Sequence, residues 1–231
     1  MRTRQKGIAR SGLIIALLLI TAVAILFLLP TPKSGPAASA APPPHTVDTV
    51  APAGGVMIGD FEDKAVESKQ YGTLILNHGH GQIGWGWSVS TDERAGGHSV
   101  ANIALIHPGA DGTHSALQVS GEIKAGFPYP WAGAIWFPGR EPMQPADLTG
   151  KQELSFWARG KPGSYNIMLM SGSPGSIPLY ASFVTTDQWK EYHIPLASSF
   201  PNADWKHVYF IAFSASNPGK FQFDLDQVSL H

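Results

Sequence analysis

The pattern of the chain changes at Val56, and this change most constrains the fold. From there on, short apolar runs are separated by Gly, Pro, Asn and Asp. Runs of this length that are rich in aromatic and β-branched residues are typical of strands. No window shows an apolar period near 3.6 residues with helix caps. We therefore predict an all-β domain over residues 56–231, with strands that include 100–106, 116–123, 134–137, 154–158, 165–170, 180–184 and 208–213.

Closely spaced strands without helices are typical of a β-sandwich or jelly roll. A domain of this length can bury roughly 70% of the surface of its unfolded chain, which is enough for one core. The sequence contains no cysteine. Disulfides and thiolate metal sites are therefore excluded.

Charge is distributed unevenly along the chain. The flank 1–11 carries Arg2, Arg4, Lys6 and Arg10 without an acidic residue, whereas residues 56–231 hold 11 Lys and Arg against 16 Asp and Glu. An acidic domain without a basic stripe is a poor match for phosphate backbones. We expect no nucleic-acid partner.

Residues 12–29 are uncharged and almost wholly apolar. As a helix this run would be about 27 Å long, close to the hydrocarbon core of a bilayer. We predict a transmembrane signal-anchor over residues 12–30, with the basic flank in the cytoplasm and the C-terminal domain outside it, in the periplasm or extracellular space. A signal peptide cleaved after the small residues 38–40 is the alternative, although the apolar run is longer than a usual signal core.

Residues 31–55 contain six prolines and six alanines, with Lys33 and Asp48 as the only charges. Such a segment buries too little surface to order itself, and proline favours extended backbone. We predict a disordered linker that holds the domain away from the membrane.

The stretch from Trp87 to Ser99 reads WSVSTDERAGGHS. An aromatic strand leads into Thr91-Asp92, a charged tip at Glu93-Arg94, and then Gly96-Gly97. Paired glycines tolerate positive φ and close backbone approach. We expect Asp92 and the glycines to fix this loop, and the charged tip to contact a partner.

The last strand, 221–230, changes phase. Its apolar positions are odd through Leu225 and even from Val228. Because side chains alternate with period two in a strand, we predict a bulge near Asp226 and an inward-facing Asp226 carboxylate. A buried carboxylate needs a cation, an arginine or backbone N–H groups as its partner.

These residues resemble the complex I intermediate-associated protein 30 family over residues 57–230. The Trp, Asp and Gly-Gly-x-Ser of its loop correspond to Trp87, Asp92, Gly96, Gly97 and Ser99. Further matches to the family are Asp60-Phe61, 131–133, 147–149, 154–160 (LSFWARG), Tyr165, Trp189, Tyr192 and Asp226. Ala95 stands where the family often has Met, and the turn after Gly160 is less acidic than in the family.

The resemblance implies a galactose-binding-like β-sandwich related to carbohydrate-binding modules. It also implies a role in assembling a respiratory NADH dehydrogenase. An anchor that places the domain outside the cytoplasm fits that role poorly, because the peripheral arm of the bacterial enzyme faces the cytoplasm.

Carboxylates near both ends of the domain are candidate ligands of a structural calcium ion: Asp60, Glu62 and Asp226. Related modules often hold calcium at such a place, and hard oxygen ligands suit it. The alternative is that these carboxylates accept backbone N–H bonds at the bulge. His78 and His80 could also take part in a metal site, but a closed zinc site needs three or four ligands.

Aromatic residues near loops are candidates for stacking on sugar rings: Trp85, Tyr129, Trp131 and Trp136. Together with Asp92, Glu93 and Arg94 they form the predicted ligand-binding set. The alternative is that most of these rings fill the core. We place Trp157, Trp189 and Trp205 in the core or at its rim.

Motifs of hydrolases, metalloproteases and nucleotide-binding enzymes are absent from the sequence. We therefore predict a membrane-tethered, exported and non-catalytic binding module that serves as a protein-interaction or assembly factor, with an envelope protein or glycan as its partner. One alternative is a carbohydrate-binding or accessory module that serves an envelope hydrolase. Another is an enzyme with an unrecognised acid or histidine site.

Overall fold

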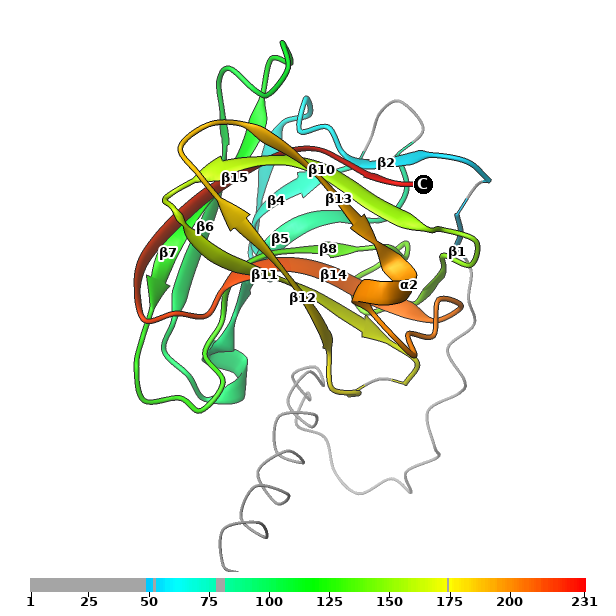
Figure 1. Cartoon of the computed structure of the whole chain (residues 1–231). Coiled ribbons are helices and arrows are strands. Elements are labelled where there is room, and N and C mark those ends of the chain that lie inside the picture. Colours follow the sequence, from blue (N-terminus) through cyan, green and yellow to red (C-terminus); the bar gives the residue numbers. More distant parts are fainter. Residues whose placement is uncertain (1–48, 52, 78–81, 174) are drawn as a thin grey trace, which may run out of the picture.

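The computed structural model describes residues 49–51, 53–77, 82–173 and 175–231. Two β-sheets face each other across one core, with loops at both ends (Figure 1). Within the described residues the only helical turns are η1 (Asp92–Ala95) and α2 (Leu196–Ser199). The predicted all-β sandwich is confirmed.

One sheet has nine strands. Its main path runs β1-β9-β14-β8-β5-β4-β3, and β11 pairs with both β14 and β12. Its members are β1 (Thr49–Val50), β3 (Ala65–Ser68), β4 (Gly72–Leu76), β5 (Gly86–Thr91), β8 (Ala132–Phe137), β9 (Ala146–Asp147), β11 (Gly163–Ser171), β12 (Leu179–Thr185) and β14 (Val208–Ala215).

The second sheet has six strands, in the order β13-β10-β15-β7-β6, with β2 also paired to β15. Its members are β2 (Val56–Gly59), β6 (Val100–Ile106), β7 (Ala116–Ile123), β10 (Glu153–Gly160), β13 (Lys190–Pro195) and β15 (Gly219–Leu230). Every strand listed from the sequence has its counterpart in these two sheets.

Aromatic rings fill the core between the sheets. Trp87 and Phe213 from one sheet meet Phe156 and Phe223 from the other, and all four are fully buried. Phe156 packs edge-on against Phe213 with ring centroids 5.0 Å apart. Such pairs add to the apolar burial that stabilises the sandwich.

The two ends of the domain meet in the six-stranded sheet. β2 runs antiparallel to β15, with Val56 opposite Leu230. The pairing of β15 with β10 shifts between Ser155 and Trp157, and Gln227 has φ 47°. The bulge predicted near Asp226 is confirmed, because one extra residue there changes the phase of the strand.

The sandwich begins earlier than its sequence suggests. Thr49 and Val50, assigned to the disordered linker, form β1 and pair in parallel with β9. The expected span 12–30, the linker up to residue 48, and His78 and His80 lie outside the described residues. Among the residues that are described, no helix is both long and apolar enough to cross a membrane.

Candidate functional site

The outer side of the nine-stranded sheet carries two parallel rows of side chains. We call this side the aromatic face. In the first row, the strand register aligns Tyr180, Met168, Ala212, Ile135 and Ser88 across β12, β11, β14, β8 and β5. Five strands span about 19 Å at the usual strand spacing. Tyr180 at the β12 edge is the exposed member of this row, and the other four are at most 4% exposed.

The second row lies beside the first and is almost wholly polar. It aligns Ser182, Asn166, Ser214, Gly133 and Ser90 across the same five strands. Ser182 is exposed at the β12 edge, whereas Ser214 at the centre is buried. The aromatic face thus places hydroxyl and amide groups next to an apolar strip.

Large side chains border these rows. A second apolar cluster on this face contains Trp131, Ile135, Phe137, Met168, Met170, Tyr209, Phe210 and Ala212, with Trp85, Ala95, Phe127 and Met143 packed against it. At the β12 edge, Tyr180 is 53% exposed and Val184 is 61% exposed. An exposed ring beside hydroxyl groups can stack on a sugar while those groups orient it.

A cavity of about 230 Å³ lies at the β5 end of the aromatic face. Ser88, Ser90 and Ile135 form its sheet side, and Glu93 and Arg94 contribute from η1. Both charged residues are exposed. The charged tip predicted as a contact point therefore borders a hollow.

Asp92 fixes η1 against the sheet. Its carboxylate is fully buried and accepts three hydrogen bonds. The donors are the Ser99 backbone N–H at 2.8 Å, the Ser99 hydroxyl at 2.7 Å and the Trp131 backbone N–H at 3.2 Å. Gly96 ends η1 with φ 91°, and a Cβ on Gly97 would lie 2.3 Å from Asp92 Cγ. Asp92 thus holds the loop in place; it is fully buried and does not line the hollow.

Two of the predicted aromatic residues contact side chains that line this hollow, and a third is exposed close by in sequence. The Trp131 indole N–H donates to the Ser90 hydroxyl at 3.1 Å. Trp85 packs edge-on against Tyr71 and Phe137. Tyr129 lies two residues before Trp131 and is 52% exposed. Of the three rings, Tyr129 is the one most open to a ligand.

Trp136 does not lie near a surface site, contrary to our expectation. It is fully buried in the main core. Trp131 and Trp136 are five residues apart along one extended segment, and an odd separation in a strand puts side chains on opposite faces. Trp157, which we predicted in the core or at its rim, is partly exposed on the outer side of β10, opposite Glu191 of β13.

Two of the three candidate calcium ligands, Glu62 and Asp226, hold the loop 107–115, and the third, Asp60, bonds to Glu62. Glu62 accepts the backbone N–H groups of His114 and Ser115, both at 2.9 Å. The Asp226 carboxylate accepts the Ala110 N–H at 2.7 Å and lies 2.6 Å from the Thr113 hydroxyl. Asp60 accepts the N–H of Glu62. This is the hydrogen-bonded arrangement named above as the alternative to calcium, and the part of the chain that the structure describes contains no group of three His, Asp or Glu side chains placed to hold a metal.

Burial raises the pKa of Asp226, and the nearby Glu62 carboxylate acts in the same direction. The geometry agrees with this direction. Thr113 Oγ1 lies within hydrogen-bond distance of both the Ala110 carbonyl oxygen and Asp226. Its single proton serves only one acceptor, so a protonated Asp226 can donate to the hydroxyl while the hydroxyl donates to the carbonyl.

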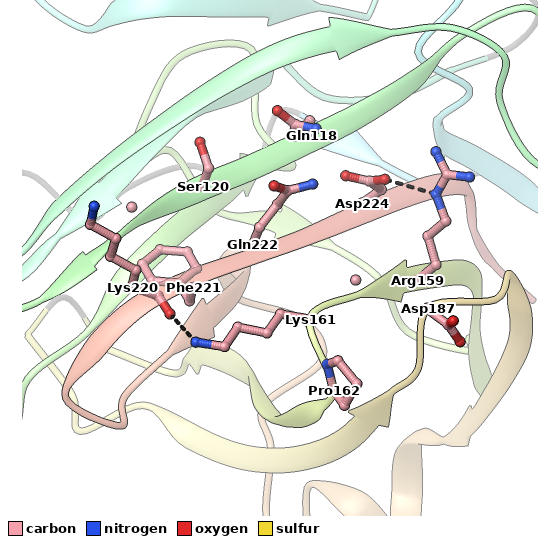
Figure 2. A pocket seen from close by; sticks show the side chains of 12 residues that line it. Gln118, Ser120, Arg159, Lys161, Pro162, Asp187, Lys220, Phe221, Gln222 and Asp224 are labelled. Atoms are coloured by element: carbon pink, nitrogen blue, oxygen red, sulfur yellow. Dashed lines mark hydrogen bonds and ion pairs between the residues drawn. The ribbon is translucent and has the colours of Figure 1, made fainter.

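A second hollow of about 730 Å³ lies on the outer side of the six-stranded sheet, which we call the polar face (Figure 2). It is lined by Gln118, Ser120, Gly121, Arg159, Gly160, Lys161, Pro162, Asp187, Lys220, Phe221, Gln222 and Asp224. This hollow was not predicted from the sequence. Its lining residues on β7, β10 and β15 alternate with core residues. This period-two alternation is the only sign of the hollow that the sequence contains.

No family model matches the chain, and no curated protein matches it. Solved structures do share its fold. The family 11 carbohydrate-binding module of a cellulosomal cellulase of Clostridium thermocellum has a TM-score of 0.54 and 17% identity, with 77% of this chain and 94% of that one covered.

Two further structures are similar. The same family 11 module in complex with a β-1,3-1,4-mixed-linked tetrasaccharide has a TM-score of 0.53 and 17% identity, covering 76% of this chain and 94% of that one. A family 30 carbohydrate-binding module has a TM-score of 0.51 and 15% identity, covering 76% and 98%. At these identities the likeness shows the fold: a jelly-roll sandwich of the kind found in carbohydrate-binding modules.

Proposed function

We propose that the sandwich is a non-catalytic carbohydrate-binding module that takes an oligosaccharide along the aromatic face. The observation that carries this proposal is the pair of rows across β12, β11, β14, β8 and β5. An apolar row ending in the exposed Tyr180 lies beside a polar row ending in Ser182 and Ser90. Sugars present apolar ring faces and hydroxyl edges, so a surface with both strips suits them.

Residues at the two ends of the rows would bind different units of the oligosaccharide. At β12, the Tyr180 ring would stack on one sugar unit. At β5, Arg94 and Glu93 border the small hollow and would bind hydroxyl groups of another unit. Tyr129, in the loop before β8, would add a second stacking ring.

The similar fold of a module solved with a mixed-linked tetrasaccharide supports the choice of ligand class. It does not identify the sugar. Binding of a β-1,3-1,4-mixed-linked tetrasaccharide to the full-length protein in detergent, measured by isothermal titration calorimetry, tests the proposal. Tyr180→Ala should weaken binding about tenfold, which corresponds to about 1.4 kcal/mol.

The matched control is Val100→Ala. Val100 is 54% exposed like Tyr180, but it lies on β6 of the six-stranded sheet. This variant should bind as the unchanged protein does. Equal affinity of the unchanged protein and Tyr180→Ala, or no binding to any sugar in a glycan array, would overturn the assignment to the aromatic face.

Attachment to the cytoplasmic membrane remains part of the proposal and rests on the apolar run 12–29. A tethered module would hold an envelope glycan, or an enzyme acting on it, near the membrane. The protein-assembly role expected from the family resemblance has a separate test. Crosslinking in the native membrane should then recover one envelope protein in stoichiometric amount, and that partner should remain bound to Tyr180→Ala.

A further inference from the structure

The polar face carries a grid of hydrogen-bonding side chains on the side of the sandwich opposite to the aromatic face. The strand register aligns Arg159 of β10, Asp224 of β15 and Gln118 of β7 in one row. The next row aligns Gln222 of β15 with Ser120 of β7. Figure 2 shows these side chains around one open hollow, with Lys161 and Lys220 at its other end.

Arg159 is held in a fixed orientation. Its Nε donates to Asp224 Oδ2 at 2.9 Å, and its guanidinium carbon lies 4.6 Å from the centroid of the Trp189 ring. Figure 2 shows its two terminal nitrogens turned away from Asp224. A guanidinium held by an ion pair and a ring presents its remaining N–H groups as a rigid fork, which fits a carboxylate with two hydrogen bonds.

Asp224 has an acceptor that nothing in the described part of the chain satisfies. The residue is 3% exposed, and its Oδ1 is buried without a hydrogen-bond partner. A buried acceptor without a donor costs about 1–3 kcal/mol. A ligand hydroxyl would supply the missing donor. Gln118, Gln222 and Ser120 can each both donate and accept bonds to further hydroxyls.

The charges of the hollow select among hydroxylated ligands. The lining of the hollow holds three cationic side chains and two anionic ones, so cations exceed anions by one. The cations are Arg159, Lys161 and Lys220, and the anions are Asp187 and Asp224. The ligand must therefore accept from a guanidinium and also donate to a carboxylate. A sugar acid does both, because it carries a carboxylate and several hydroxyls.

We propose that this hollow, defined by Arg159, Asp224, Gln118, Gln222 and the two lysines, is a second saccharide site that binds a sugar unit bearing a carboxylate. Arg159 receives the ligand carboxylate. Asp224 Oδ1 accepts a ligand hydroxyl, and the amides bind the neighbouring hydroxyls. Lys161 and Lys220 add long-range attraction at the rim. The volume of about 730 Å³ is within the range of small-molecule sites.

The test is calorimetric titration of the full-length protein with trigalacturonate, and with cellotriose as the neutral counterpart. We expect trigalacturonate to bind, and to bind several-fold more weakly when salt is raised from about 50 mM to about 500 mM. Arg159→Gln should weaken binding at least tenfold. The exposed pair Lys161→Gln and Lys220→Gln should weaken it about threefold without altering the melting temperature.

Asp187→Asn is the matched control, because it removes an exposed charge of the opposite sign from the same rim. It should bind trigalacturonate as tightly as the unchanged protein or slightly more tightly. The proposal is overturned if folded protein does not bind trigalacturonate, if cellotriose binds equally well, or if the rim lysines and Arg159 have no effect. None of these outcomes depends on the aromatic face, where Tyr180→Ala should leave trigalacturonate binding unchanged.

Discussion

The aromatic face and the polar face use the same period-two alternation but differ in what supports their functional groups. On the aromatic face, a second apolar cluster lies beneath and beside the polar row, and the loop held by Asp92 brings η1 over the sheet. On the polar face, the groups stand directly on the strands and are oriented by one another, as Arg159 is by Asp224. The first arrangement depends on the loop held by Asp92. The second depends mainly on strand register, with Lys161, Asp187 and Trp189 added from the turns beside it.

The largest expected effect comes from removing the carboxylate that supports the aromatic face. Asp92→Ala deletes the acceptor of three hydrogen bonds in a fully buried position, leaving the Ser99 and Trp131 donors unsatisfied. We expect a loss of about 3 kcal/mol in the free energy of unfolding, measured in urea. Ser99→Ala, which removes one of these bonds, should cost about 1 kcal/mol. A loss below about 1 kcal/mol for Asp92→Ala would show that the loop does not depend on this residue.

A smaller effect is expected where the polar-face sheet holds the loop 107–115. Thr113→Val keeps the side-chain shape but removes the hydroxyl that lies between Asp226 and the Ala110 carbonyl. We expect a destabilisation of about 1.5 kcal/mol, since that hydroxyl contacts a buried carboxyl group. Tyr180→Ala is the comparison on the other face: its exposed ring should change the free energy of unfolding by less than about 0.5 kcal/mol.

The raised pKa of Asp226 predicts the sign of a pH effect. Because the folded state holds this proton more tightly than the unfolded state, the stabilisation is complete below the unfolded pKa, about 3.9, and is lost as the pH rises through the folded pKa. The difference in unfolding free energy between the unchanged protein and Asp226→Asn should therefore fall from about pH 3 to about pH 7. If this difference increased instead, hydrogen bonding to the carboxylate would dominate over its burial; the donors are the backbone N–H groups of Ala110 and Gln227 and the Thr113 hydroxyl.

The two faces should act independently of each other. Affinities for trigalacturonate and for the mixed-linked tetrasaccharide, measured in Tyr180→Ala, Arg159→Gln and the double variant, form two mutant cycles. The sites share no residue, so we expect coupling energies below about 0.5 kcal/mol. A larger coupling energy would mean that one ligand spans both faces or that the faces communicate through the core.

Sequence patterns predicted local structure well because strand length, alternation and glycine position are local properties. The bulge at Asp226 follows from a phase change within one strand, and the fixed loop follows from Asp92, Gly96 and Gly97. Even the opposite orientations of Trp131 and Trp136 are implied by their odd spacing in sequence. What could not be predicted is which strands become neighbours.

Arg159 and Asp224 are 65 residues apart in sequence, and their contact exists because β10 pairs with β15. Asp226 likewise meets Ala110 and Thr113 across more than a hundred residues. The choice between calcium and backbone donors depended on those non-local contacts. The same holds for the rows of the aromatic face, whose register joins five strands of which only β11 and β12 are consecutive in sequence.

The smallest expected effect is a shift in titration at the β13 edge of the polar face. His193 Nδ1 lies 2.8 Å from Glu153 Oε1, and Glu191 lies on its other side at 3.5 Å. The hydrogen bond to Glu153 raises the pKa of His193 above its usual value, with both carboxylates contributing charge. Nuclear magnetic resonance titration should show this, and Glu153→Gln should bring the pKa of His193 back toward 6.5. Since the folded pKa is the higher one, the small stabilisation is present below the unfolded pKa and disappears as the pH rises through the folded pKa.

Because the pair of His193 and Glu153 is exposed, its effect should also decline with added salt, whereas the bonds of the buried Asp92 should be insensitive to salt. Equal salt sensitivity at the two sites would contradict the distinction between a face supported by a buried loop and one whose groups stand in solvent.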